Sequence, residues 1–306
     1  MKVVADGFLF IDKPRGPSSF AVVSAVRRAF HVKRVGHGGT LDPSASGLLV
    51  VALGSATRLL PYAPLEPKGY SFGIRFGEQT DTLDSAGTVI KNGGSVPSRQ
   101  VLLATLPSFC GRLMQVPPEY SAVKVSGIRA YHVARSGRVP IMRPRPITIH
   151  ALHLVKYDEL FGEAQLEVTC SGGTYVRSLA RDIAEALGTC GYALFVRRTA
   201  LGPFHVDKAI KIDICDIAKT PLVPSGDVLR GMSRIAVGEE QKQRLIAGGN
   251  LPFTEAPGGG ALPVATTLAI DRDNNIIAVL EPSAAGYFHP ARVFSTRLCD
   301  SLHKRS

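Results

Sequence analysis

Residues 36–47 read Gly36-His37-Gly38-Gly39-Thr40-Leu41-Asp42-Pro43-Ser44-Ala45-Ser46-Gly47, and this tight loop is the most informative part of the chain. The apolar run Leu48–Leu53 follows at once and ends at Gly54, which is typical of a buried β-strand. One carboxylate, that of Asp42, therefore lies in a glycine-rich loop at the edge of a strand.

Two interpretations fit Asp42 when the loop is considered alone. In the first, the loop is an ordinary turn, in which the carboxylate accepts hydrogen bonds from nearby backbone amides and Pro43 fixes the bend. In the second, a stiff loop holds Asp42 in place for a chemical task. The loop favours neither interpretation, so the rest of the chain has to decide.

The charge of the chain points to a partner. A net charge of +11 over 306 residues indicates a polyanion, although surplus lysine and arginine also keep proteins soluble. The segment Ser121–Tyr157 contains no Asp or Glu, and its prolines exclude one continuous helix. We therefore predict an extended basic arm over residues 121–157 that contacts phosphates through Lys124, Arg129, Arg135, Arg138, Arg143, Arg145 and Lys156.

Composition also excludes several classes of protein. No apolar run approaches the roughly 20 residues that cross a bilayer, and the first residues lack the apolar core of a signal peptide. The five cysteines lie far apart in the sequence and suggest neither a zinc site nor a disulfide framework. Scattered thiols suit a reducing compartment. We predict a cytoplasmic protein that binds neither a metal nor a membrane.

Hydrophobic periodicity predicts a mixture of helices and strands. Alternation over Lys68–Phe76 puts Tyr70 on the apolar face of a strand. Spacing over 174–187 predicts a helix with Arg177 in its first turn. Further expected elements are strands over 8–11, 147–155, 165–170 and 192–201, a helix over 97–109, and a helix over 20–30 that buries Phe20, Val23, Val26 and Phe30. After Met232, short β-like runs and a hairpin signal over 268–279 indicate a small all-β domain.

A resemblance to a known family rests on six segments that lie in one order along residues 7–205. They are Asp12-Lys13-Pro14, the loop Gly36–Gly47, Lys68-x-Tyr70, Gly77-x-x-Thr80-Asp81-Thr82-x-Asp84, Gln115-Val116-Pro117-Pro118-x-Tyr120-Ser121-Ala122-x-Lys124 and Gly173-Thr174-Tyr175-Val176-Arg177-Ser178. Together they closely resemble the TruB family of tRNA pseudouridine synthases. Gly38 and Ser46 stand where members of that family commonly carry Thr.

The resemblance implies an α+β fold with two domains. Residues 1–232 would form a pseudouridine synthase catalytic domain, in which helices surround a mixed, largely antiparallel sheet. Residues 233–306 would form a small all-β PUA-like domain that binds RNA, to which Ile246–Gly249 and Pro290–Phe294 bear a more distant likeness.

The implied activity is the isomerisation of uridine to pseudouridine at position 55 in the T-loop of tRNA. The enzyme would act on a uridine flipped out of its stack. The resemblance implies no cofactor and no metal. The expected partner is the T-stem loop of tRNA, bound by a monomer that needs no obligatory protein partner.

The resemblance also assigns roles to individual residues. Asp42 becomes the nucleophile, which forms a temporary bond to the nucleoside. Arg177 becomes its partner, since the helix dipole disfavours a cation in the first turn unless a carboxylate compensates it. Tyr70 becomes a ring that stacks on the uracil and whose phenol shuttles a proton. His37 would fill the vacated space or hold the flipped nucleotide, and the expected phosphate contacts are Lys13, Lys124, Arg143 and Arg145.

Each assignment has a plain alternative, in which Arg177 is a surface residue, Tyr70 a core residue and His37 a loop residue bonded to backbone. Two other functions compete for the whole chain. One is an RNA-binding protein that keeps the scaffold without catalysis, which the joint presence of Asp42, Tyr70 and Arg177 argues against. The other is a guide-RNA-dependent synthase of the dyskerin type, which we expect least because such relatives usually carry terminal extensions.

Overall fold

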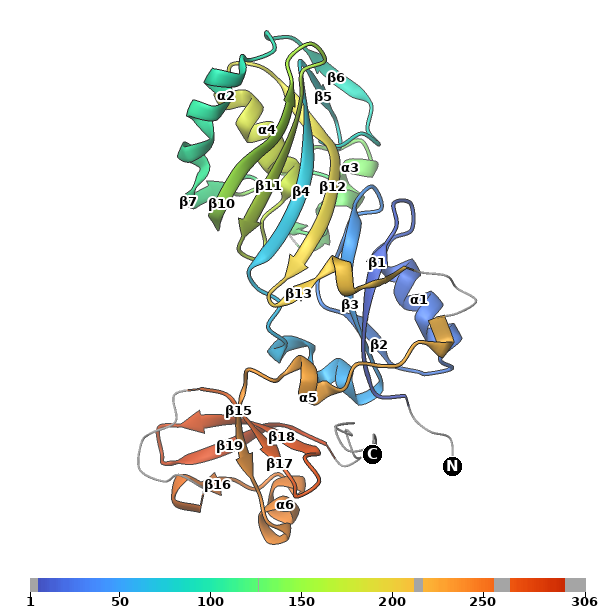
Figure 1. The fold of residues 1–306 in the computed structure, drawn as a ribbon, viewed down its shortest axis with the longest axis vertical. Helices are drawn as coiled ribbons and strands as arrows, with labels where there is room; N and C mark the ends of the chain where they lie inside the picture. Colours follow the sequence, from blue (N-terminus) through green and yellow to red (C-terminus); the bar gives the residue numbers. More distant parts are fainter. Residues whose placement is uncertain (1–4, 126, 212–216, 256–264, 295–306) are drawn as a thin grey trace.

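The structure is a computed structural model that describes residues 5–125, 127–211, 217–255 and 265–294 (Figure 1). Within these ranges the chain forms one large sheet, a second smaller sheet and two short hairpins. Helices pack around the sheets, so the predicted α+β class is confirmed. No helix in the described ranges is long and apolar enough to cross a membrane. Cys110, Cys170 and Cys190 are free thiols, and Cys215 and Cys299 lie outside the described residues.

The large sheet is mixed but largely antiparallel, as predicted. Its main path runs through β14 (Ile210–Lys211), β1 (Gly7–Lys13), β3 (Ser46–Leu53), β12 (Gly191–Leu201), β4 (Lys68–Phe76), β11 (Glu163–Cys170), β10 (Arg145–Asp158) and β7 (Gly111–Gln115). Two further strands join at the side, β2 (Val35–His37) on β3 and β13 (Phe204–His205) on β12. Parallel pairing occurs between β1 and β14 and between β3 and β12.

This sheet has a narrow junction between β3 and β12. Two residue pairs join these strands, Arg197 with Ser46 and Arg198 with Gly47, whereas β12 and β4 pair along almost their whole length. The loop that carries Asp42 connects β2 to β3 and therefore lies directly at the junction. Figure 1 shows the two halves of the sheet meeting there, with β1 and β3 on one side and β4, β11 and β12 on the other.

One helix covers each half of the sheet. Helix α4 (Val176–Ala186) buries Leu179 and Ile183 in the same apolar cluster as Phe72 and Ile74 of β4. Helix α1 (Ser19–Ala29) buries Val22 and Val26 against the other half, and the side chain of Ser18 caps its first turn by accepting from the amide of Ala21.

The predicted buried face of α1 is partly wrong. Phe20 is 69% exposed, whereas Val22, Val23, Ala25 and Val26 are buried. The side chain of Ser19 turns inward, because it bonds both backbone groups of Leu41 in the Asp42 loop. That contact fixes the rotation of the helix and leaves Phe20 pointing to solvent.

Shorter elements complete the first 232 residues. They are the hairpin strands β5 (Glu78–Thr80) and β6 (Val89–Asn92), the helices α2 (Arg99–Thr105) and α5 (Ser225–Val228), and the 3-10 helices η1 (Gly54–Tyr62), η2 (Leu106–Phe109), η3 (Val206–Lys208) and η4 (Ile217–Lys219). Ser98 caps α2 through its side chain, as its place before the predicted helix suggested.

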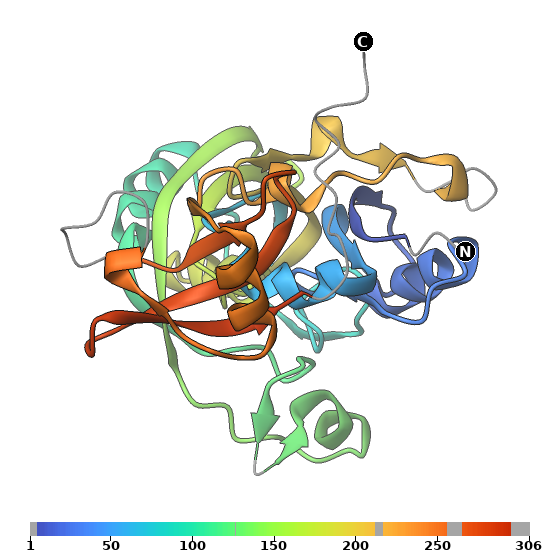
Figure 2. The same ribbon diagram turned by 90° about the horizontal axis from the view of Figure 1, so that it is seen from below.

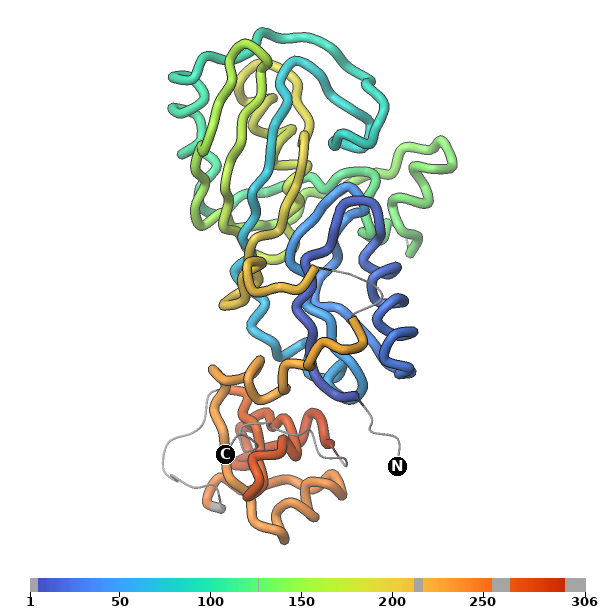
Figure 3. Tube along the Cα trace, turned by 45° about the vertical axis from the view of Figure 1, so that its right-hand side comes forward, coloured from blue at the N-terminus to red at the C-terminus, as the bar shows by residue number. Residues whose placement is uncertain are grey.

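The predicted basic arm over residues 121–157 divides into two parts. Residues 121–144 contain the hairpin β8 (Lys124–Val125) and β9 (Ile128–Arg129) and the helix α3 (Ala130–Arg135). This part projects from the body of the protein, in green, in Figures 2 and 3. Residues 145–157 instead belong to β10, whose Ile147, Ile149 and Leu152 pack in the core. The projecting arm is therefore shorter than predicted, because the last third of the segment belongs to the sheet.

Every described strand of the second sheet lies beyond residue 232. The order is β15 (Ser233–Ala236), β17 (Thr267–Ile270), β18 (Ile276–Ser283), β19 (Tyr287–Val293) and β16 (Leu251–Pro252). Strands β17 and β18 form the predicted antiparallel hairpin. Helix α6 (Glu239–Ile246) also packs here, which the sequence reading missed, and the 3-10 helix η5 (Phe253–Glu255) follows β16.

The two sheets share part of their apolar core. One cluster contains Phe8 and Leu48 from the large sheet together with Leu268, Ile276 and Phe294 from the second sheet. The guanidinium of Arg58 spans the same contact: it donates to the carbonyl of Val293 at 2.7 Å and lies over the ring of Phe294 at 4.9 Å.

Candidate active site

The loop that carries Asp42 is held in place from several directions. The hydroxyl of Ser19 accepts from the amide of Leu41 at 2.8 Å and donates to its carbonyl at 2.9 Å. The amide of Gly16 donates to the carbonyl of Pro43 at 2.8 Å. Ser44 donates to the carboxylate of Asp84 at 2.7 Å. These contacts come from distant segments, so the loop is fixed by the tertiary structure.

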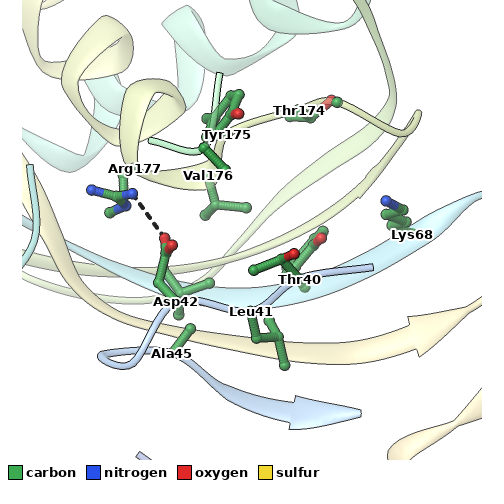
Figure 4. Close-up of a pocket in the computed structure, with 13 residues that line it drawn as sticks. Thr40, Leu41, Asp42, Ala45, Lys68, Thr174, Tyr175, Val176 and Arg177 are labelled. Carbon is green, nitrogen blue, oxygen red and sulfur yellow. Dashed lines mark ion pairs between the residues drawn. The ribbon is translucent and has the colours of Figure 1, made fainter. Parts of the chain in front are cut away.

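Asp42 forms an ion pair with Arg177, at 2.8 Å between Oδ2 and Nη2 (Figure 4). The side chain of Asp42 is 42% exposed, whereas that of Arg177 is 6% exposed. The carboxylate thus faces open space while the guanidinium lies behind it. Among the described residues Asp42 makes no capping hydrogen bond to a backbone amide, so the interpretation of this residue as an ordinary turn cap is not supported.

Arg177 itself is held rigidly by two other loops. It donates to the carbonyl of Thr82 at 2.6 Å and to that of Tyr120 at 2.9 Å. Its Nε lies 3.8 Å from the carboxylate of Asp84. Because two carbonyls and the Asp84 carboxylate hold it from the other sides, the guanidinium presents a fixed edge to Asp42.

The structure brings four of the sequence motifs together at this point. The side chain of Gln115 exchanges hydrogen bonds with the backbone of Tyr175, donating at 3.2 Å and accepting at 2.8 Å. Ser178 donates to the carbonyl of Val116 at 2.9 Å. Segments around residues 42, 82, 120 and 177 therefore meet, although they are far apart in the chain.

A cavity of about 220 Å³ opens beside the ion pair. It has about seven times the volume that one water molecule occupies in the liquid. Five segments of the chain line it, and Figure 4 draws the lining residues as sticks and labels most of them. The lining residues are Thr40, Leu41, Asp42, Ala45, Lys68, Tyr70, Ala122, Gly173, Thr174, Tyr175, Val176, Arg177 and Val196.

Tyr70 forms part of the wall of this cavity and is 8% exposed. Burial raises the pKa of its phenol, against the opposing effect of the nearby Arg198 guanidinium. The phenol is therefore neutral near pH 7 and can donate a hydrogen bond inside the cavity.

Sequence reasoning missed Arg198, the largest of the fully buried side chains. Its Nε donates to the carbonyl of Leu48 at 2.7 Å, and its terminal nitrogens donate to Thr40 at 3.3 Å and Gly39 at 3.1 Å. Arg198 thereby ties both ends of the Asp42 loop to β12. Arg198 follows Arg197 in a largely apolar strand. These two adjacent arginines are the one feature of the sequence that could have pointed to a buried cation here.

His37 lies on β2, half-buried, and does not line the cavity. Its Nδ1 is buried and has no hydrogen-bond partner among the described residues. Burial lowers the pKa of the ring, and the positive charge of Arg198 acts in the same direction. His37 is thus a neutral aromatic ring near pH 7, and its role toward a flipped nucleotide stays a prediction.

Lys13, one of the predicted phosphate contacts, lies inside the protein. Lys13 is fully buried, and its Nζ donates to the carbonyls of Pro14 at 2.8 Å and Pro17 at 2.9 Å. Burial lowers its pKa to about 8, while the charge of Asp42 acts in the opposite direction. Its ammonium therefore bonds to the turn behind the Asp42 loop, and its contact with a phosphate stays a prediction.

The other predicted phosphate contacts are exposed and outside the cavity. Lys124 lies in β8, two residues after the cavity residue Ala122, and Arg143 lies in the irregular stretch before β10. Arg145 begins β10 and lies near Tyr175, whose pKa it lowers against the stronger effect of burial. Their contacts with phosphates stay predictions.

Gly38, one of the two departures from the family pattern, has a structural counterpart. A Cβ atom at this position would lie 2.3 Å from Cδ1 of Leu65, so the leucine occupies the space that a larger residue would need. The loop beside His37 is therefore packed in spite of the glycine.

Comparison with known proteins agrees with this geometry. Residues 27–176 match the family described as TruB family pseudouridylate synthase, N-terminal domain. A protein of Nitrobacter winogradskyi named tRNA pseudouridine synthase B is 37% identical, and the match covers 98% of this chain and 86% of the relative. The protein of that name from Gluconacetobacter diazotrophicus is 46% identical over 72% of this chain and 70% of its own length.

The fold itself recurs in solved structures. The Cbf5 chain in a crystal structure of a Cbf5–Nop10–Gar1 complex superposes with a TM-score of 0.69, over 96% of this chain and 87% of that chain, at 21% identity. Fold and sequence together define the chain as a pseudouridylate synthase. It belongs to the TruB family.

Proposed function

We propose that this enzyme converts uridine 55 in the T-loop of tRNA to pseudouridine and that Asp42 is its nucleophile. As a member of the TruB family, the chain is an enzyme that isomerises uridine in tRNA. The observation that carries the finer assignment is the ion pair of Asp42 with the buried Arg177 at the wall of a nucleobase-sized cavity.

The reaction rearranges bonds within one nucleotide. The bond between N1 of uracil and C1′ of ribose breaks, a bond between C5 and C1′ forms, and the proton on C5 is replaced by one on N1. Asp42 adds to the nucleoside, at C1′ of the ribose or at C6 of the base, and leaves again once the base has turned. The nucleotide gains and loses no group overall, so apart from the temporary bond to Asp42 the cavity has only to bind the nucleotide and move one proton.

The neighbours of Asp42 support such a step. Arg177 is fixed by two carbonyls and offers a constant charge to the carboxylate before attack and after departure. Tyr70 lines the cavity, so its ring can stack on a base there and its neutral phenol can donate a proton. The held loop limits the motion of Asp42, which favours attack on a bound carbon.

The uridine has to leave its stack to reach Asp42, which costs a few kcal/mol. Exposed cations on residues 124–145 would bind the phosphates of the surrounding arm and offset that cost. His37 would fill the space that the base vacates. The second sheet would add a further RNA contact, and its division from a catalytic domain near residue 232 is part of this proposal.

We also propose that the enzyme acts as a monomer without an obligatory protein partner, in the cytoplasm. Several relatives at 36–46% identity that cover most of the chain are named tRNA pseudouridine synthase B. The Cbf5 neighbour occurs in a complex with other proteins, but at 21% identity it supports the fold alone.

The test is conversion of an unmodified tRNA transcript by the purified protein, with pseudouridine mapped at single-nucleotide resolution. Wild type should modify uridine 55, and Asp42→Asn should bind the transcript without converting it. Asp207→Asn, which changes an exposed carboxylate outside the cavity, serves as the matched control and should retain full activity.

Three results would count against parts of the proposal. Turnover by Asp42→Asn at the wild-type rate removes the nucleophile. Conversion of a different uridine removes the assigned position. Binding without any conversion by wild type favours the non-catalytic alternative, or the alternative that requires partners if a cell extract restores activity.

A further inference from the structure

Lys68 is a second cationic group in the cavity, to which the resemblance assigns no separate role. It is the first residue of β4, two positions before Tyr70, and it is half-buried. It lines the cavity with Thr40 and Thr174. Figure 4 shows these three residues on the side of the cavity away from the Asp42–Arg177 pair.

Lys68 differs from the other cations near the site in having no bonded partner. Arg177 pairs with Asp42 and with two carbonyls, Arg198 donates to three carbonyls, and Lys13 donates to two. Within the described part of the chain, the ammonium of Lys68 makes neither a hydrogen bond nor an ion pair.

The surroundings of Lys68 make its charge costly. Burial lowers the pKa of its ammonium, and the positive charge of Arg198 lowers it further. The carboxylate of Glu66 acts in the opposite direction but is too far away for an ion pair, and it packs against Gly172 instead. A half-buried ammonium without acceptors is a poor arrangement for the free protein and a good one for binding an anion.

The shape of a nucleotide indicates which anion this is. Asp42 has to reach C1′ or C6, and both carbons adjoin the glycosidic bond. When that bond lies against Asp42, the phosphates flanking the ribose lie toward the periphery of the cavity. Threonine hydroxyls and lysine are common phosphate ligands, and the full charge of a phosphate compensates a half-buried ammonium better than a uracil carbonyl does.

We propose that Lys68 binds a phosphate oxygen next to the flipped-out uridine, so that the cavity grips the nucleotide at two ends, by Asp42 at the glycosidic bond and by Lys68 at the backbone. This inference rests on the proposed function, because it takes the occupant of the cavity to be a uridine of an RNA chain.

The test is a double-mutant cycle between the protein and the RNA backbone. The probe is a T-arm stem-loop in which one phosphate, 5′ or 3′ of the target uridine, is replaced by an uncharged methylphosphonate. Dissociation constants are measured in the Asp42→Asn background, so that no turnover occurs. Lys68→Met should weaken binding of the all-phosphate RNA roughly tenfold.

The methylphosphonate at the contacted position should weaken binding to the Lys68 protein by a similar factor. It should make no further difference to Lys68→Met, because the contact is already lost. Lys68→Arg, which keeps the charge, should restore part of the affinity. Lys68→Gln repeats the cycle if the methionine variant melts early, and Lys208→Met is the control at an exposed lysine.

The inference is overturned if each methylphosphonate weakens binding to Lys68→Met by the same factor as it weakens binding to the Lys68 protein. Lys68 would then contact the base or no part of the RNA. Conversion of the all-phosphate stem-loop by wild type is measured first. Its failure contradicts the proposed function, whereas conversion combined with independent effects contradicts the role of Lys68 alone.

Discussion

At the scale of single residues, burial separates the cations of this site into different roles. Lys13, Arg177 and Arg198 are all buried and all bond to backbone carbonyls, so they hold loops in place. Arg177 alone among these three also forms an ion pair with Asp42. A buried cation needs an acceptor for each of its donors. Backbone carbonyls of irregular loops supply most of them here, because helix and strand hydrogen bonds do not occupy such carbonyls.

Lys13 should leave a signature in the pH dependence of stability. Its pKa is about 8 in the folded protein and about 10.5 when the chain is unfolded. Below about pH 8 it is charged in both states, and its burial then lowers the free energy of unfolding. Between these values the unfolded chain binds more protons, so the free energy of unfolding contributed by Lys13 rises with pH.

We therefore expect the free energy of unfolding of wild type, relative to Lys13→Met, to rise by about 2 kcal/mol between about pH 7 and about pH 10. Urea unfolding at several pH values measures this difference. Other groups, such as the thiol of Cys170, whose pKa burial raises to about 11, titrate equally in both proteins and cancel. If the free energies of unfolding of the two proteins change with pH in parallel, Lys13 has an ordinary pKa in the folded protein.

Some residues of the site could be predicted from sequence and others could not, for a physical reason. Asp42, Tyr70 and Arg177 lie in short motifs, and the structure brings all three to one cavity. Arg198 and Ser19 act on backbone groups far away in the chain, so no local pattern shows which groups they bond. Burial of Lys13 was equally invisible, because a lysine in a turn normally faces water.

At the scale of elements, periodicity found most helices and strands, and tertiary contacts corrected their faces and ends. Strand β4 and helix α4 have the predicted apolar faces, since both pack in the largest core cluster. Helix α1 is rotated by its bond to the Asp42 loop, which no helical pattern contains. The basic segment was expected as one arm because charge dominates its composition, yet its last third is strand β10.

The projecting part of this segment and the start of β10 should contribute affinity in proportion to the phosphates they neutralise. Arg143 and Arg145 are exposed where the arm meets the sheet. Arg143→Ala and Arg145→Ala should each weaken binding of a tRNA transcript and flatten the slope of log K against log salt by about one unit.

Binding titrations over a range of salt concentrations measure these slopes, and Lys208→Met provides a matched loss of one exposed charge far from the arm. The arginine variants should melt close to the wild-type temperature, because neither side chain makes a hydrogen bond or an ion pair among the described residues. A slope identical to wild type would remove the arm from the RNA interface.

At the scale of the whole molecule, the second sheet is part of the packing as well as a candidate RNA surface. The amino-acid pattern after Met232 marks a separate module, yet Leu268, Ile276 and Phe294 pack in one cluster with Phe8 and Leu48 of the large sheet. Sequence alone could not show this, because each strand is apolar enough to have filled a core of its own. The apolar face of β3 that the second sheet covers leads directly into the Asp42 loop.

Stability and activity should therefore both depend on the contact between the two sheets. Phe294→Ala removes a buried ring from this contact and should lower the free energy of unfolding by about 3 kcal/mol or more. Because β3 holds one end of the Asp42 loop, the Phe294→Ala protein should lose its activity at the temperature at which it unfolds, and this temperature should be lower than for wild type. Melting curves and residual-activity measurements on the same samples record the two temperatures. Phe288→Ala, in the core of the second sheet alone, is the matched control. The opposite result would be a Phe294→Ala protein that still converts tRNA at a temperature at which its second sheet has already melted. The two sheets would then be independent units, and the shared cluster would contribute nothing to the active site.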